Sequence, residues 1–309
     1  SGVNDVTVNL YTATGTFVAT TTTANYGGAP GYYEFDNLLP GQYYVQIPST
    51  DFDDSGDPLY DYVSTTTTGN DEITNEASDE NGIDANPLTS GIRTQTYDLQ
   101  PNSEQTTEAQ DNYSGALDDD NVNFTADLSF VQLVAIGNRV WLDTGTGAGI
   151  ADNGIQDGGE AGIFGVEVEL FNAGDNPATA TPVDTTTTNA LGDYYFDLLN
   201  PGDYFVHIPA SEFAATEPLE GYVSSTGAGG DDSNDHNADE NGIDENDLAT
   251  NGISSNDYAL APELEPATDL DTGYTGYLDD DNVNLTADFG FLQKVALGNR
   301  VWFDTNNDA

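Results

Sequence analysis

The segment GDYYFDLLNPGDYFVHIP, residues 192–209, contains two runs of aromatic and β-branched residues on either side of a Pro-Gly pair. Such residues favour strands, and a Pro-Gly turn ends one strand and begins the next. A closely similar segment, GYYEFDNLLPGQYYVQIP, occupies residues 31–48. The segment therefore predicts a pair of successive strands that occurs twice in the chain.

Other motifs recur at the same spacing of about 160 residues, so the whole chain is built from a repeated unit. The repeated motifs are DENGID at 79–84 and 239–244, LDDDNV at 117–122 and 278–283, and GNRVW at 137–141 and 298–302. They predict a first unit at 1–136 without its opening strand, a complete unit at 137–297, and the opening strand of a further unit at 298–309.

Strand signals fill each unit. VTVNLY (6–11) and VEVELF (166–171) alternate apolar and polar residues, and TFVATTTT (16–23) and VDTTTT (183–188) are rich in Thr. Residues 283–303 form a long β-rich run that should carry the last strand of one unit into the first strand of the next. Because we find no convincing helical period, we expect an all-β fold of tandem β-sandwich domains.

The chain is strongly acidic, with a formal net charge of −51 over 309 residues and four basic residues in total. Phosphate binding needs Lys and Arg, so we expect no nucleic-acid partner and no anionic membrane surface. Cys is absent, which excludes disulfides and thiolate metal sites, and no apolar run is long enough to predict a membrane span. So acidic a fold needs bound cations or high salt to limit its self-repulsion.

Together the motifs resemble a known family. The order GNRVWLDT, DNGIQDGGE, GDYYFDLLNPGDYFVHIP and DDDNVNLTADFGF is similar to that of the B-type (SdrD B-like) repeat of serine-aspartate repeat surface proteins, a relative of the Cna-B-like domains of other surface proteins. The resemblance implies Greek-key-type sandwiches that are extracellular or on the cell surface, bind Ca²⁺, and are strung in tandem as a stalk or fibre.

Three acidic clusters are candidate metal sites. The first, DNGIQDGGE, resembles the later part of an EF-hand-like loop, in which oxygen ligands alternate around a Gly and a closing Glu binds bidentately. The second places oxygen-bearing residues at alternate positions before a Gly. The third places three adjacent Asp residues, which repel one another unless a cation lies among them. Oxygen ligands without Cys favour Ca²⁺ over Zn²⁺.

The candidate ligands divide among the three clusters. The first comprises Asp143, Asp152, Asn153, Asp157 and Glu160, with a partial C-terminal copy at Asp304, Asn306 and Asp308. The second comprises Asp231, Asp232, Asp235, Asn237, Asp239, Asn241 and Asp244, and in the first unit Asp71, Glu72, Asn75, Asp79, Asn81 and Asp84. The third comprises Asp118, Asp119 and Asp120, and Asp279, Asp280 and Asp281. The alternative interpretation is that all three are solvated acidic loops.

We do not expect an enzyme. His207 is matched by Gln46 in the first unit and His236 by Glu76, so the two units share no His base. The Tyr-rich strands favour core and cross-strand packing over a sugar-binding platform. The alternative to a structural fibre is an adhesin or carbohydrate-binding module. Arg139 is a lone cation within its strand and should pair with a nearby carboxylate.

Without an opening strand, the first unit should expose an unpaired strand edge and an open core. Residues 298–309 of a second copy could fill this place, and such a head-to-tail contact forms open filaments. Alternatively, the chain is a segment of a longer array whose covalent neighbours do the same. Both explanations stay open, and both imply a linear assembly whose partners are copies of the chain or tandem neighbours.

Overall fold

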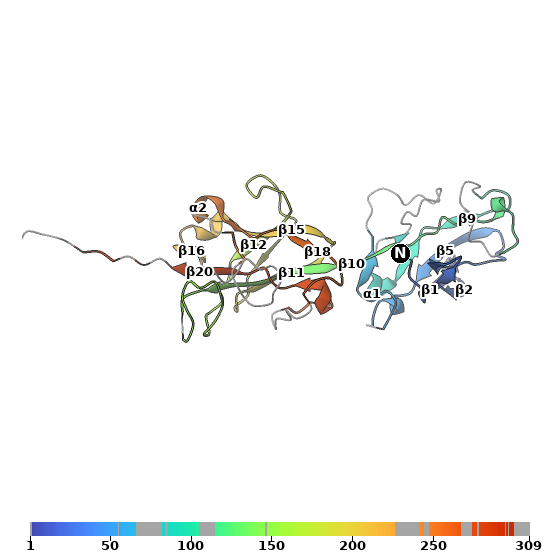
Figure 1. Ribbon diagram of the computed structural model, residues 1–309. Coiled ribbons are helices and arrows are strands. Elements are labelled where there is room, and N and C mark those ends of the chain that lie inside the picture. Colours follow the sequence, from blue (N-terminus) through green and yellow to red (C-terminus); the bar gives the residue numbers. More distant parts are fainter. Residues whose placement is uncertain are drawn as a thin grey trace, which may run out of the picture. The chain divides into compact units, whose positions relative to one another are not determined.

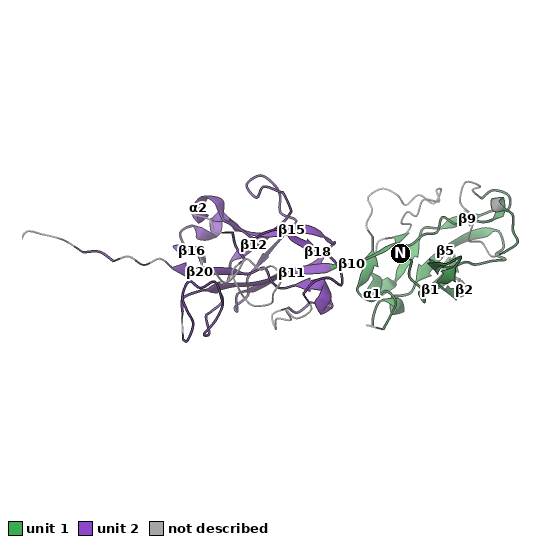
Figure 2. Cartoon of the chain, in the orientation of Figure 1, with its two compact units in different colours: residues 1–133 green, residues 134–309 purple. Residues whose placement is uncertain are grey.

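The computed structural model divides the chain into two units, residues 1–133 and residues 134–309 (Figures 1 and 2). It describes residues 2–54, 56–65, 82–83, 86–104, 115–145, 147–225, 241–243, 247–266, 274–276, 278–293, 295 and 297–299. The division falls three residues before the Gly137 start expected from sequence, because the opening strand of unit 2 already begins at Val134.

The described residues of unit 2 form two β-sheets. The order in the first sheet is β14-β11-β20-β16, and β19 also pairs with β11. The order in the second is β13-β12-β15-β17, and β18 also pairs with β15. The strands of the first sheet are β11 (Val134–Leu142), β14 (Asp193–Leu199), β16 (Tyr222–Ser224), β19 (Val283–Asn284) and β20 (Phe289–Gln293). Those of the second are β12 (Glu167–Asn172), β13 (Asp184–Thr187), β15 (Gly202–Ile208), β17 (Ile253–Ser254) and β18 (Tyr258–Leu260).

The opening strand β11 lies in the middle of its sheet. It pairs antiparallel with β14 on one side, and parallel with β19 and β20 on the other. The two successive strands predicted around the Pro-Gly turn are present and do not pair with each other, because β14 and β15 belong to separate sheets. The Pro-Gly turn therefore carries the chain from one layer of the sandwich to the other.

One hydrophobic core fills unit 2. Strand β12 alternates as expected, since Val168 and Leu170 are fully buried and Glu167 is exposed. The core cluster joins these residues to Ile136 and Val140 of β11 and to residues of β14, β15 and β20. Both sheets thus contribute to one core, which is the arrangement of a β-sandwich.

In unit 1 the larger sheet corresponds to the second sheet of unit 2, and the counterpart of the first sheet is reduced to one pair of strands. The order of the larger sheet is β2-β1-β5-β8-β7, with β9 also on β5, and the second sheet is the pair β10-β6. The strands are β1 (Thr7–Thr12), β2 (Phe17–Thr22), β5 (Gly41–Ile47), β6 (Tyr62–Ser64), β7 (Gly82–Ile83), β8 (Ile92–Thr94), β9 (Tyr97–Leu99) and β10 (Phe130–Gln132). A separate hairpin joins β3 (Ala24–Tyr26) and β4 (Ala29–Tyr32).

Helical structure in the described part of the chain is limited to single turns. These are α1 (Pro87–Ser90), α2 (Leu248–Asn251) and the 3-10 turns Ser49–Asp51, Asp119–Asn121, Ala210–Phe213 and Asp280–Asn282. Asn86 caps α1 by accepting a hydrogen bond from the Leu88 N–H. Turns of this length are too short to produce a helical period in the sequence.

The place that β11 occupies in unit 2 holds no strand in the described part of unit 1. The repeat aligns Tyr33–Leu38 with β14, yet residues 33–38 belong to no strand. Among the described residues of unit 1, buried apolar side chains gather around Phe52 and Leu59 and around Val8 and Leu10, and Leu128 packs against both groups.

Candidate functional site: acidic loops and the opening strand

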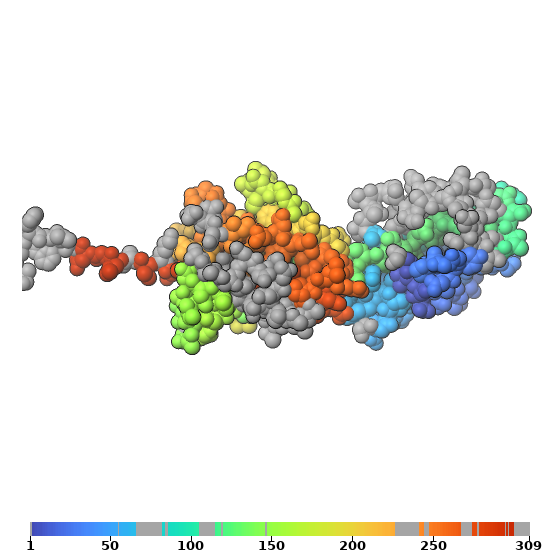
Figure 3. Space-filling model, in the orientation of Figure 1, coloured from blue at the N-terminus to red at the C-terminus, as the bar shows by residue number. Residues whose placement is uncertain are grey.

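The first acidic cluster of unit 2 forms a closed loop directly after β11. Trp141 bridges to Gly162, so the chain leaves β11 and returns beside it. Asp143 is fully buried at the base of this loop, and Glu160 is buried at its end. The loop contributes to the surface of unit 2, where it is coloured green (Figure 3).

The carboxylate of Asp143 binds backbone from the far side of the loop. Its Oδ1 accepts from the Asp152 N–H at 2.8 Å, and its Oδ2 accepts from the Gly154 N–H at 2.8 Å and from the Ser225 hydroxyl. Gly154 has a φ of 72°, so the turn suits a residue without a Cβ. Asp143 thus ties the base of the loop to its far side through backbone N–H groups.

Asp157 and Glu160 close the other half of the loop. Asp157 Oδ1 accepts from the Ile150 N–H at 3.0 Å, and Glu160 Oε1 accepts from the Gly145 N–H at 2.6 Å. Asn153 Nδ2 donates to Asp157 Oδ2 at 3.3 Å. These side chains carry the oxygen donors that Ca²⁺ prefers, and three carboxylates of the loop accept from backbone N–H groups.

The third cluster forms a 3-10 turn at Asp280–Asn282, next to β19. Burial, and secondarily the charge of Asp281, raises the pKa of Asp280. The turn is tied to the preceding loop, because the Glu265 N–H donates to the Asp281 carbonyl at 3.0 Å and the Glu263 N–H donates to Asn282 Oδ1 at 2.8 Å. The adjacent acids are thus held side by side by backbone contacts.

Glu265 is a buried acid that the sequence analysis missed. Its Oε1 accepts from the Ala261 N–H and its Oε2 accepts from Asn284 Nδ2, both at 2.7 Å. Burial raises its pKa. In unit 1, Glu104 makes the matching contacts with the Gln100 N–H and Asn123 Nδ2. Recurrence of a Pro-x-x-Glu segment at 101–104 and 262–265 was the available signal.

Much of the second cluster lies outside the described residues. This applies to Asp231, Asp232, Asp235, Asn237, Asp239 and Asp244, to the unit 1 set Asp71, Glu72, Asn75, Asp79, Asn81 and Asp84, and to Asp304, Asn306 and Asp308. Asn241 is described and buried. The Asn241 N–H donates to the Asp288 carbonyl at 2.9 Å, and the Asp288 N–H donates to Asn241 Oδ1 at 3.0 Å. Asn241 therefore holds the residue that directly precedes β20. Within the described residues, no three acidic or His side chains form a ready-made metal cluster.

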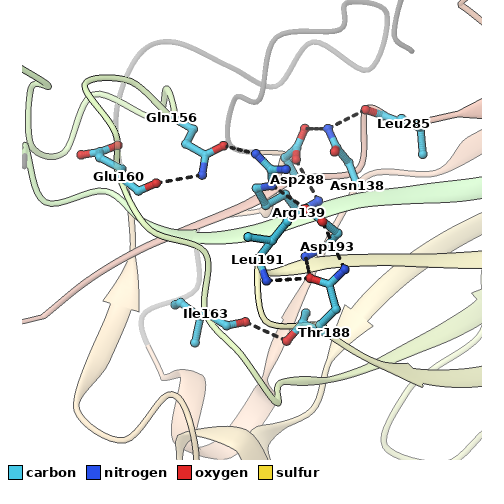
Figure 4. A network of polar contacts seen from close by, with 11 residues as sticks. Asn138, Arg139, Gln156, Glu160, Ile163, Thr188, Leu191, Asp193, Leu285 and Asp288 are labelled. Atoms are coloured by element: carbon cyan, nitrogen blue, oxygen red, sulfur yellow. Dashed lines mark hydrogen bonds and ion pairs between the residues drawn. The ribbon is translucent and has the colours of Figure 1, made fainter. Parts of the chain in front are cut away.

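A polar network surrounds the middle of β11 (Figure 4). Asn138 Nδ2 donates to Asp288 Oδ2 at 3.0 Å and to the Leu285 carbonyl at 2.7 Å. The Arg139 N–H donates to Asp288 Oδ1 at 3.1 Å, and its Nε lies 2.7 Å from Asp193 Oδ1. The predicted pairing of Arg139 with a carboxylate is confirmed.

Gly137 permits the closest approach along β11. A Cβ at this position would lie 2.2 Å from the Tyr194 carbonyl oxygen, a distance that van der Waals contact forbids. The GNRVW motif is therefore a strand-docking motif: Gly allows contact with β14, and Asn and Arg fix the register through buried carboxylates.

The described Tyr hydroxyls mostly bind backbone within the sandwich. Tyr33 donates to the Ala126 carbonyl and Tyr194 to the Ala287 carbonyl, each at 2.5 Å. Tyr43 and Tyr204 make matching bonds to the carbonyls of Leu39 and Asn200, at 2.8 Å. These contacts agree with the packing role expected for the Tyr-rich strands.

His207 lies in the sandwich. Its Nδ1 is 2.8 Å from Ser254 Oγ, and its ring meets Phe171 edge to face. Desolvation lowers its pKa to about 4. No helix in the described part of the chain is long and apolar enough to cross a membrane.

Comparison with known proteins identifies a matching family and several similar proteins. The SdrD B-like domain family matches residues 1–112 and 134–262. Serine-aspartate repeat-containing protein F of Staphylococcus epidermidis is 28% identical over 91% of the chain, which spans 12% of that protein. Serine-aspartate repeat-containing protein D of Staphylococcus aureus is 34% identical over 60% of the chain, which spans 10% of that protein.

Among solved structures, GBS52, a minor pilin of Streptococcus agalactiae, is similar over 98% of this chain and 88% of its own. The sequence identity is 10% and the TM-score is 0.26.

Proposed function

Because the chain belongs to the SdrD B-like domain family, we propose that it is part of an extracellular structural protein, a calcium-stabilised stalk or fibre of β-sandwich units joined head to tail. The observation that carries the proposal is the junction of the two units. Strand β10 ends at Gln132 and β11 begins at Val134, so one residue separates the last strand of one sandwich from the first strand of the next. So short a connection suits a stiff array more than freely jointed modules.

The repeated acidic loops support calcium as the stabilising ion. Asp143, Asp157 and Glu160 would hold it in the first loop, and the acids of the Asp279–Asp281 turn would hold it in the third. When bound, the ion would offset the mutual repulsion of carboxylates within each loop. The donor chemistry fits, since the loops contain oxygen donors and no Cys.

Family membership and fold favour a structural or adhesive role over an enzymatic one. The two units repeat the same tyrosine and glutamate contacts, which serve packing and turn formation. An adhesin or carbohydrate-binding module remains the alternative. A glycan and matrix-protein binding screen separates the two, because a stalk should bind none of the probes saturably.

Calorimetry of the whole chain tests the calcium proposal. We expect the melting temperature to rise by several degrees in millimolar calcium relative to excess chelator, since a ligand at about 100 times its Kd adds about 2.7 kcal/mol per site. Asp157→Asn should lower the number of calcium ions bound in a titration. The matched control is Asp203→Asn, at an exposed position on β15. An unchanged melting temperature in chelator would contradict the proposal.

A further inference from the structure

Strand β2 is the outer strand of the larger sheet of unit 1, because the sheet order among the described residues begins with it. Phe17 is 55% exposed and Val18 is 41% exposed, and Thr20 and Thr22 are exposed as well. The segment lies at the surface of unit 1, where it is coloured blue (Figure 3). An outer strand turns one row of backbone N–H and C=O groups away from its sheet, so it can pair with a further strand.

The alternation along β2 identifies the groups that face outward. The Thr23 N–H donates to the Val6 carbonyl at 2.9 Å, so Thr23 faces β1, and the ladder with β1 is regular over the preceding residues. In an antiparallel pair, successive residues turn their N–H and C=O groups alternately toward the partner and away from it. Thr21 therefore faces β1 as well, and Thr20 and Thr22 turn their backbone groups outward.

This edge lies within a stretch of sequence that carries no charge. Residues 6–33, which contain β1, β2 and the β3–β4 hairpin, include no Asp, Glu, Lys or Arg, although charged residues make up 19% of the chain. Two copies of a chain with a net charge of −51 repel each other wherever their acids meet. At this edge two copies can approach without bringing acids of these strands together. The matching residues 166–194 of unit 2 include the acids Glu167, Glu169, Asp175, Asp184 and Asp193.

Unit 2 protects the corresponding edge with charge. Its outer strand β13 has four residues and begins at Asp184, and the neighbouring strand β12 places Glu167 and Glu169 beside it. In unit 1 the corresponding positions of β1 hold Thr7 and Asn9. Charged residues at an edge oppose pairing with another strand. The edge of unit 1 lacks this protection.

The open edge does not depend on the opening strand. The place of that strand is in the sheet that contains β10 and β6, whereas β2 belongs to the larger sheet. In unit 2, where β11 is present, β13 is likewise the outer strand of its sheet among the described residues, and three of its four residues are exposed. The open edge is therefore a feature of the sandwich itself.

We propose that β2 of unit 1 pairs side by side with β2 of a second copy of the chain, antiparallel and about a twofold axis, so that two larger sheets join into one. The contact goes beyond the head-to-tail joining of the proposed function, because both copies contribute the same strand. Such a contact uses each edge once and closes at a pair of copies, whereas head-to-tail contacts continue into filaments.

The outward-facing residues determine the register of this pair. Thr20 of one copy lies opposite Thr22 of the other, with Thr21 on the twofold axis, and each of the two Thr20–Thr22 pairs exchanges both of its N–H···O bonds. Directly opposed Thr side chains also stabilise such a pair. A displacement by two residues would involve Val18, where the ladder with β1 shifts its register, or Ala24, which belongs to β3.

Charge placed on the edge tests the contact. Thr20→Glu/Thr22→Glu sets Glu opposite Glu in both pairs, which should weaken the association by about tenfold. Both positions are exposed, and their neighbours on β1 are uncharged, so unit 1 should remain folded. The matched control is Thr179→Glu/Thr181→Glu, which adds the same charge at the same spacing to exposed residues of the loop before β13.

A charge exchange tests the register. Thr20→Lys/Thr22→Lys, mixed with the double Glu variant, sets Glu opposite Lys in both pairs. The mixture should therefore associate more tightly than either variant alone, because opposite charges at directly opposed positions attract.

The experiment is sedimentation equilibrium of the whole chain from micromolar to millimolar concentration, at about 0.15 M salt to screen distant acids. Amide hydrogen exchange, measured by NMR on the same samples, locates the contact. We expect the wild type and the control to form pairs and to show slower exchange at Thr20 and Thr22 as the concentration rises, with little change at Thr21. The double Glu variant should keep fast exchange at both positions, and addition of the double Lys variant should slow it.

Several results would overturn the proposal. Exchange at Thr20 and Thr22 that is fast at every concentration would show that the edge stays free, and slow exchange already in the dilute monomer would assign the edge to a segment of the same chain. Equal association of the double Glu variant and its control would place the contact elsewhere, and a mixture no tighter than its components would reject the twofold register. Head-to-tail joining continues beyond pairs and is not changed by the Glu variant, so failure of the lateral contact and failure of the stalk are distinguishable.

Discussion

At the level of single residues, Gly137 is the position of the GNRVW motif at which the opening strand packs directly against the backbone of β14. Any side chain there would enter the space of the Tyr194 carbonyl, while the same motif position at Gly298 is open. We expect Gly137→Ala to lower the free energy of unfolding of unit 2 by about 1–3 kcal/mol, the usual cost of overpacking. Urea unfolding at low protein concentration measures it. Gly298→Ala is the control, and equal losses in both variants would contradict the argument.

His207 gives a pH-dependent prediction for unit 2. Burial lowers its pKa from 6.5 to about 4, so between these values the unfolded state binds more protons than the folded state. Stability contributed by the neutral ring is present above pH 6.5 and is lost as the pH falls toward 4. His207→Gln, which copies Gln46 of unit 1, should remove this loss.

The measurement is the free energy of unfolding at pH 7 and pH 5, in chelator, for wild type and variant. We expect the fall in stability to be smaller in His207→Gln by about 1–3 kcal/mol. Comparing the two proteins cancels the titration of the carboxylates they share. A parallel pH dependence in both would show that the ring is not held neutral by burial.

At the level of elements, the turn carrying the third acidic cluster depends on Glu265. Glu265→Gln leaves an amide N–H₂ facing the Asn284 N–H₂ donor, and Asn284 cannot simply flip because its Oδ1 already accepts from Thr286. We expect unit 2 to lose about 1–3 kcal/mol, the cost of a buried unpaired polar group. Thermal unfolding measures this loss. Glu104→Gln should cost less, since Glu104 is less buried than Glu265, and the reverse order would refute the assignment.

Elements with a strong local pattern were predictable from sequence. The alternation of VEVELF predicted β12, and the Thr-rich runs predicted β2 and β13. The prediction of a long β-rich run at 283–303 was only partly right. Residues 285–288 leave the strand, and Asp288 then accepts hydrogen bonds from Asn138 and Arg139 of β11. A buried carboxylate that binds a distant backbone N–H has no local signature.

The sequence patterns did not predict which distant strands pair with each other. The parallel contact of β11 with β20 joins residues about 150 positions apart, and periodicity identifies strands without naming their partners. Repetition supplied what periodicity could not. The offset of about 160 residues between motif copies identified the repeated unit. The same comparison, applied to Pro-x-x-Glu, would have identified Glu104 and Glu265.

At the level of the whole molecule, a net charge of −51 must be balanced for the sandwiches to persist, either by ions bound in the loops or by general screening. These two explanations differ in their concentration dependence. Specific calcium sites saturate at low concentration, whereas screening of exposed charges depends on ionic strength, with a Debye length of about 10 Å at 0.1 M and about 3 Å at 1 M.

We therefore expect millimolar calcium to raise the melting temperature by several degrees, and sodium chloride of equal ionic strength to leave it nearly unchanged. Molar sodium chloride should recover part of the stability, because it screens the exposed acids without bridging carboxylates that lie within one loop. Magnesium at the calcium concentration is the matched control, since its smaller octahedral shell fits flexible carboxylate loops less well. Differential scanning calorimetry in chelator, calcium, magnesium and the two sodium chloride concentrations separates the contributions. Equal stabilisation by calcium and by sodium chloride at matched ionic strength would mean that the acidic loops act through solvation alone, and the stiffness of the array would then have to come from its strand junctions.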